Sequence, residues 1–113
     1  MPQDQPVAVL DLKDSGRSRR QMVLPILCLW MGFLGFSLCH APIPGVNEPH
    51  YLTKSLHAWN PDWCAGDFFL ESSNAHLVFY RTIGALTLVT SFATAALIGR
   101  VLAYLLLALA WQQ

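Results

Sequence analysis

Two long apolar blocks dominate the pattern of hydrophobic and polar positions along this chain. Residues 22–39 hold no charged side chain, and residues 83–111 hold one, Arg100. An α-helix rises about 1.5 Å per residue, so each block is long enough to cross most or all of the roughly 30 Å hydrocarbon core of a bilayer. A soluble domain of 113 residues buries one such helix but hardly both. The pattern predicts an all-α membrane protein with two transmembrane helices and an outer loop that contains short interfacial helices.

The residues before the first apolar block indicate its orientation. Residues 1–21 are polar and show no usable periodicity, so we expect a disordered tail. Lys13 and the cluster Arg17-Ser18-Arg19-Arg20 precede the block. Basic residues stay on the cytoplasmic side of a span, which places tail 1–21 in the cytoplasm, transmembrane helix 22–39 after it, and loop 40–81 on the periplasmic or extracellular side.

Two other interpretations of this region are less favourable. The stretch from Ser18 to Leu24 is somewhat like a twin-arginine export signal, but its apolar part is too long for one. A cleaved signal peptide has an apolar region of about 7–15 residues, and cleavage after Ala41 would place Pro42 directly behind the cut bond. We expect an uncleaved helix.

The loop 40–81 has recognisable start and stop signals for one helix. The run 41–45, APIPG, cannot continue a helix, and Asn47 is a suitable N-cap for one. Asn60-Pro61 ends it, which predicts a short amphipathic helix over 48–59. On this helix His50, Lys54 and His57 form a polar stripe. Aromatic residues suited to the membrane interface follow or end it: Trp59, Trp63, Phe68, Phe69, Phe79 and Tyr80.

The second apolar block is too long for one span. We expect 82–113 to hold an interfacial helix, over about 76–93, and then transmembrane helix 2 over about 94–112. The alternative is a span over 82–99 that delivers Arg100 to the cytoplasm. The sequence stops at Trp111-Gln112-Gln113 without a basic anchor, which favours a fragment of a longer polytopic protein.

Composition excludes several classes of function. Hydrophobic residues make up 54% and charged residues 12% of the chain, against about 25% charged in soluble domains. The formal net charge is zero, so we expect no nucleic-acid partner. P-loop, GxGxxG, HExxH, GxSxG and CxxC motifs are absent. Cys28, Cys39 and Cys64 suggest no disulfide framework.

The carboxylates are the best candidates for chemistry. Glu48 follows the first span on the outer face and leads the predicted helix. A carboxylate there can act as a general base or as ligand of a metal-bound phosphate, while the simpler alternative is stabilisation of the helix dipole. His50 and His57 suggest a metal, but no second carboxylate is fixed nearby. We therefore predict no metal site, and the cofactors stay unknown.

Two stretches carry a resemblance to a known superfamily: Asn47-Glu48-Pro49-His50-Tyr51-Leu52 and Asn60-Pro61-Asp62-Trp63-Cys64-Ala65-Gly66-Asp67-Phe68-Phe69. With the layout of residues 22–113, they resemble the N-terminal part of an uncharacterised family of bacterial multi-pass membrane proteins, similar to GT-C glycosyltransferases. The resemblance implies a lipid-phosphate sugar donor, such as a polyprenyl-phosphate sugar, and a place in the bacterial cytoplasmic (inner) membrane.

The same resemblance implies roles for single residues. Glu48 would be the catalytic base, Asp67 a second acidic position, and Lys54 or Arg100 would face the donor phosphate. The superfamily position usually begins with Asp where this chain has Asn47, so a base role would rest on Glu48 alone. The alternative function is a small bitopic interaction subunit without catalytic activity. Its Gly32 and Gly35 would then pack against transmembrane helices of the same or a partner protein.

Overall fold

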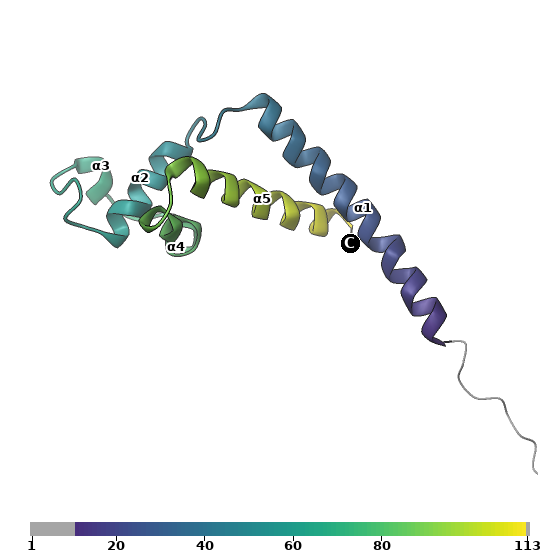
Figure 1. Ribbon diagram of the computed structural model, residues 1–113. Coiled ribbons are helices and arrows are strands. Elements are labelled where there is room, and N and C mark those ends of the chain that lie inside the picture. The colour runs from purple at the N-terminus through teal and green to yellow at the C-terminus, as the bar shows by residue number, and fades with distance from the viewer. Residues whose placement is uncertain (1–10, 113) are drawn as a thin grey trace, which may run out of the picture.

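The computed structural model describes the backbone of residues 11–112 and the side chains of 21–112. Within residues 11–112 the regular secondary structure is helical, and turns or short links join the helices (Figure 1). The helices are α1 (Asp11–His40), α2 (Glu48–Trp59), α3 (Phe68–Glu71), α4 (Leu77–Arg81), the 3-10 helix η1 (Ile83–Leu88) and α5 (Phe92–Trp111). The predicted all-helical class is confirmed. In two of these helices, segments Gln21–His40 and Phe92–Trp111 are long and apolar enough to cross a membrane.

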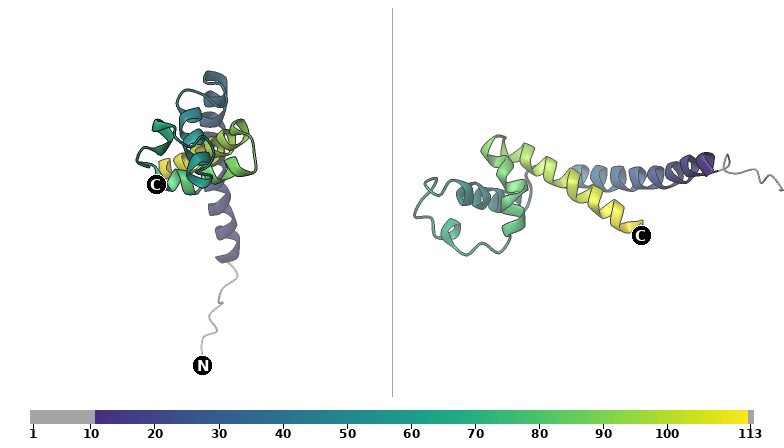
Figure 2. Two further views of the ribbon diagram at one scale, coloured as in Figure 1. Left: turned by 90° about the vertical axis from the view of Figure 1, so that its left-hand side faces the viewer. Right: turned by 90° about the horizontal axis from the view of Figure 1, so that it is seen from below.

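These two long helices form an antiparallel hairpin, in which α5 runs back beside the C-terminal half of α1 (Figures 1 and 2). The indole Nε1 of Trp30 donates a hydrogen bond to the carbonyl of Val101 at 3.0 Å. The rings of Phe33 and Tyr104 stack with 6.3 Å between their centroids. Residues 41–91 gather at one end of the hairpin, and we call them the cap.

The first helix begins earlier than expected. The sequence predicted a disordered tail over 1–21, but α1 starts at Asp11, and residues 1–10 lie outside the described part of the chain. Once the apolar block is helical, adding neighbouring residues costs little because helix propagation is far easier than nucleation. Lys, Arg and Gln are good helix formers, so this polar stretch continues the helix. Pro25 therefore lies inside α1.

The second apolar block breaks near residue 90. The Ser91 side chain caps α5 by accepting a hydrogen bond from the Thr94 amide at 3.2 Å. The alternative span over 82–99 is therefore wrong, while α5 at Phe92–Trp111 lies close to the expected 94–112. A single helix over 76–93 is also wrong, because α4 and η1 replace it. The hydroxyls of Thr87 and Thr90 bond to backbone carbonyls within this segment and so compete with continuous helix.

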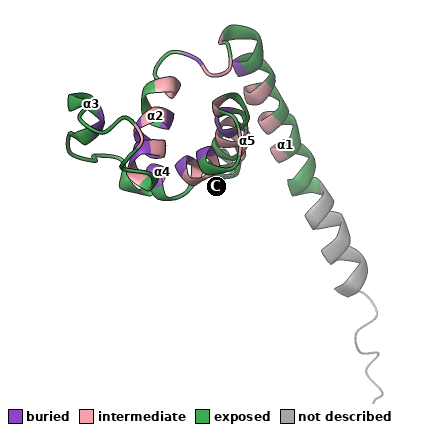
Figure 3. Cartoon of the chain, turned by 60° about the vertical axis from the view of Figure 1, so that its left-hand side comes forward, coloured by how far each residue is buried: buried purple, intermediate pink, exposed green. Residues whose placement is uncertain are grey.

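The cap packs around α2. A small core lies between the cap and the first turns of α5: it consists of Leu52, Ala95 and Ala96, with Ile43, Phe79, Leu86 and Phe92 packed against it. The bounds of α2, Glu48–Trp59, match the predicted helix, and the helix carries several buried residues (Figure 3). Of its polar stripe only His50 is exposed, whereas Lys54 and His57 are buried. The loop after α2 folds back over that side of the helix, and His57 Nδ1 lies 2.7 Å from the Trp63 carbonyl.

Candidate functional site

Glu48 and Arg100, 52 positions apart in sequence, form an ion pair where the cap meets the hairpin. Arg100 Nε lies 2.6 Å from Glu48 Oε1, and Nη2 lies 2.8 Å from Oε2. The Gly45 amide also donates to Glu48 Oε2 at 2.7 Å. The side chain of Arg100 is 10% exposed and that of Glu48 29% exposed. This is the one ion pair among the side chains of residues 21–112.

Arg100 has no N–H left for a ligand in this arrangement. A guanidinium carries five N–H groups, and Glu48 accepts two of them. The other N–H of Nη2 donates to the Pro42 carbonyl at 2.7 Å. Nη1 donates to the Ala41 carbonyl at 3.2 Å and to Ser37 Oγ at 3.5 Å. Arg100 thus joins α5 to the end of α1, to the 41–45 link and to the start of α2.

Both carboxylate oxygens of Glu48 already accept hydrogen bonds. Burial on its own raises the pKa of Glu48, but the hydrogen bonds from Arg100 and Gly45, together with the Arg100 charge, outweigh burial and leave the pKa below its ordinary value. A general base works best when its pKa lies near the working pH. In this arrangement Glu48 is an anchor for Arg100, and a base role requires the pair to open.

Lys54 lies inside the cap rather than at a donor-binding surface. The residue is only 5% exposed. Its ammonium donates to the Phe69 carbonyl at 3.1 Å and to Ser72 Oγ, and it lies 5.0 Å from the centroid of the Phe69 ring. Lys54 therefore holds the 68–72 turn against α2. The structure does not bring Lys54 together with Glu48 and Arg100, as a shared phosphate site would require.

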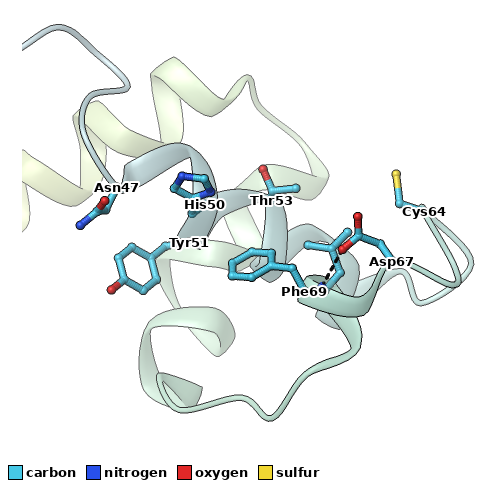
Figure 4. A pocket seen from close by; sticks show the side chains of 8 residues that line it. Asn47, His50, Tyr51, Thr53, Cys64, Asp67 and Phe69 are labelled. Carbon is cyan, nitrogen blue, oxygen red and sulfur yellow. Dashed lines mark hydrogen bonds between the residues drawn. The ribbon is translucent and has the colours of Figure 1, made fainter.

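Asp67 lines a hollow between α2 and the 64–70 stretch of the cap, which we call the outer hollow (Figure 4). Its Oδ1 accepts a hydrogen bond from the Leu70 amide at 3.0 Å and caps α3. The outer hollow measures about 680 Å³. Its lining combines an amide, an imidazole, hydroxyls and a carboxylate with aromatic rings: Asn47, His50, Tyr51, Thr53, Cys64, Asp67, Phe69 and Leu70.

A second hollow, which we call the apolar groove, follows α5 from the cap into the hairpin. It measures about 790 Å³ and runs from Val46 in the link, past Leu52 and Phe79, to Leu102 and Leu106 on α5. The Glu48–Arg100 pair lies in its wall. Asn47 and Tyr51 line both the outer hollow and the apolar groove, so the two hollows adjoin.

The sequence did not predict the junction between the two hollows. Asn47 was expected to cap α2, but its side chain makes no capping hydrogen bond and lines both hollows instead. Its place directly before Glu48 was the only signal. The histidines do not cluster either: His50 meets the edge of the Phe69 ring at 5.9 Å. Among the described residues, no group of three or more His, Cys, Asp or Glu side chains could hold a metal ion.

No protein-family model matches this chain, and comparisons with curated proteins and with solved structures found no match. The two adjoining hollows and the network around Arg100 are therefore the basis on which a function can be proposed.

Proposed function

We propose that this chain is an integral membrane protein of the bacterial cytoplasmic membrane, in which α1 and α5 cross the bilayer and the cap lies on the outer face. We further propose that it binds a sugar donor built on a lipid phosphate, as the N-terminal part of a GT-C-like glycosyltransferase. The basic residues before α1 favour a cytoplasmic N-terminus. The cap is expected on the opposite side, because it holds only two Lys or Arg residues, Lys54 and Arg81, against four before the first apolar block.

The observation that carries the donor proposal is the adjacency of the two hollows. A lipid-linked sugar has a head rich in hydroxyls and a long apolar tail. The outer hollow offers Asn47, His50 and Asp67 for hydrogen bonds to hydroxyls, and Tyr51 for contact with an apolar sugar face. The groove beside it offers apolar side chains along α5. We expect one amphipathic ligand to extend from one hollow to the other past Asn47 and Tyr51, which line both.

Within this proposal Glu48 and Arg100 act first as positioning residues. Their ion pair ties the cap to the hairpin, and so sets the position of the outer hollow relative to the apolar groove. Arg100 can meet the donor phosphate only by exchanging one of its present acceptors. In a full-length transferase, Glu48→Gln is expected to abolish sugar transfer while the protein stays folded, and preserved turnover overturns the catalytic role.

The binding proposal is tested with the chain in lipid nanodiscs and a polyprenyl-phosphate monosaccharide as the probe. We expect saturable binding, and about tenfold weaker binding for Asn47→Ala, since one good polar contact contributes on the order of 1–1.5 kcal/mol. The matched control is Asn74→Ala, because Asn74 is exposed and lines neither hollow. Equal losses in both variants, or no saturable binding, contradict the proposal.

A second candidate function is a non-catalytic interaction subunit, and one observation favours it. Added Cβ atoms at Gly32 and Gly35 would meet nothing within 4 Å. Large side chains of α1 are exposed as well, including Met31 at 59% and Phe36 at 67%. Small residues let neighbouring transmembrane helices approach closely. Gly35→Leu should then abolish co-purification with a larger membrane protein, whereas Leu38→Ala should preserve it.

A further inference from the structure

Residues 77–89, which comprise α4, η1 and their flanking residues, carry four large apolar side chains that no other described element covers. Leu77 is 56% exposed, Val78 79%, Leu88 48% and Val89 79%. Other residues of the segment pack on the rest of the cap: Tyr80 and Thr87 are buried, and Gly84 lies against Ser55. A surface that faces water shows the reverse pattern, with polar side chains outward.

The position of this segment along α5 indicates what covers these side chains. A Cβ atom on Gly99 would lie 3.2 Å from Ile83 Cγ2, so η1 packs directly on α5 at Gly99. Gly99 lies about 10 Å along the helix from Phe92, at about 1.5 Å per residue. If α5 crosses the bilayer as proposed, it needs nearly all of its 20 residues to do so, and its start then marks the outer boundary. Segment 77–89 therefore lies level with the first turns of α5 (Figures 1 and 2).

Charge supports the same environment. Between residues 72 and 91 the sequence has no acidic residue, and Arg81 is its only full charge. The Arg81 guanidinium lies 5.2 Å from the centroid of the Trp59 ring. Trp rings and Arg side chains are typical of the headgroup region, where lipid phosphates attract cations.

The backbone is suited to lipid contact as well. Irregular backbone is costly in lipid unless its polar groups are satisfied internally. The Thr82 amide donates to the carbonyls of Val78 and Phe79, and the Ala85 amide donates to the Thr82 carbonyl. The amides of Val89 and Thr90 both donate to the Leu86 carbonyl, so the exits from α4 and η1 keep their hydrogen bonds within the segment.

We propose that segment 77–89 is immersed in the outer leaflet of the bilayer, with Val78 and Val89 among the upper acyl chains and Arg81 at the lipid phosphates. The inference rests on the proposed crossing of the membrane by α1 and α5. It adds a third lipid contact that does not span the membrane.

The test places one environment-sensitive fluorophore at a time in the full chain, reconstituted in vesicles of phosphatidylethanolamine and phosphatidylglycerol. Cys28, Cys39 and Cys64 are free and are first replaced by Ser. The probe then goes to Val78→Cys, and to Ala65→Cys as the matched control, because Ala65 is a small exposed residue in the turn between α2 and α3. We expect lipid-borne nitroxide to quench the Val78 probe several-fold more than the Ala65 probe, and aqueous iodide to show the reverse order.

A third probe at Leu106→Cys, on α5, separates the two proposals. If lipid nitroxide fails to quench Leu106, the membrane crossing itself is wrong. If it quenches Leu106 but not Val78, only the immersion of segment 77–89 is overturned. A Val78 probe shielded from both quenchers means that a second copy of the chain covers it, which also overturns the inference. Val89→Cys repeats the measurement at an independent position, and circular dichroism confirms that each variant is folded.

Discussion

The Glu48–Arg100 pair leads to a quantitative prediction for Glu48→Ala. The substitution removes three hydrogen bonds at once: two from Arg100, at 2.6 and 2.8 Å, and one from the Gly45 amide at 2.7 Å. It also leaves the Arg100 charge, only 10% exposed, without a counter-ion. The neutral acceptors at Ser37, Ala41 and Pro42 remain in place.

The expected loss follows from burial. Removing one partner of a fully buried ion pair costs about 3–5 kcal/mol in the free energy of unfolding. Glu48 keeps 29% of its side-chain exposure, so water replaces part of what Arg100 loses. We therefore expect Glu48→Ala to cost about 2–3 kcal/mol, and Glu48→Gln, which keeps an acceptor but no charge, about half as much.

Denaturant titration in mixed micelles, followed by tryptophan fluorescence, measures these losses. Asp62→Ala is the control, because Asp62 is exposed and forms no ion pair; it should change stability by less than about 0.5 kcal/mol. Arg100→Leu completes a double-mutant cycle, in which the two substitutions should be strongly non-additive. A Glu48→Ala loss no larger than that of the control, or simple additivity in the cycle, refutes the reasoning.

Three further predictions concern pH and packing. The pKa of Glu48 lies below its ordinary value, so the pair contributes fully to stability above about pH 4.3, the pKa of an unfolded Glu. This contribution is lost as the pH falls through the folded pKa. Denaturant midpoints should therefore show an acid loss of stability in the wild type that is absent in Glu48→Gln. Gly84→Ala would press a Cβ atom against Ser55 Cβ and should lower the free energy of unfolding by about 1–3 kcal/mol. Adding Ser55→Gly should restore part of this loss in the same titration, and no recovery would contradict the packing explanation. Trp30→Phe removes the donor to the Val101 carbonyl and should cost about 0.5–1.5 kcal/mol by thermal unfolding in micelles, with Trp111→Phe, exposed at the end of α5, as the control.

The features that could be predicted from sequence are those with local causes. The apolar blocks define segments long enough to cross a bilayer, and Asn60-Pro61 defines the end of α2 at Trp59. The start of α1 at Asp11 could not be predicted, because helix extension depends on the neighbouring helix rather than on polar composition. Lys54 and His57 were misplaced for a similar reason: their periodicity was correct, but the loop that buries them lies later in the chain.

In the candidate site, too, the sequence indicated single residues but not the contacts that arise from packing. Sequence singled out Glu48 and Arg100 separately, yet nothing in their surroundings indicated a pair across 52 positions. Asn47 and Tyr51 could not be recognised as the junction of two hollows, because a hollow arises from the packing of several elements. Asp67 lies at one of those hollows, where the resemblance had suggested only a second acidic position.

The Arg100 network also sets an order for assembly during synthesis. All five of its N–H groups donate to residues between Ser37 and Glu48, which leave the ribosome well before Arg100 does. Until Arg100 on α5 has been made, the 41–45 link and the start of α2 lack the cation that they bind in the folded chain. Contacts between residues so distant in sequence form late, because the intervening chain must first be ordered. A nascent chain that ends before Arg100 should therefore carry a loosely held cap, open to proteases, which tightens only when the second long helix arrives.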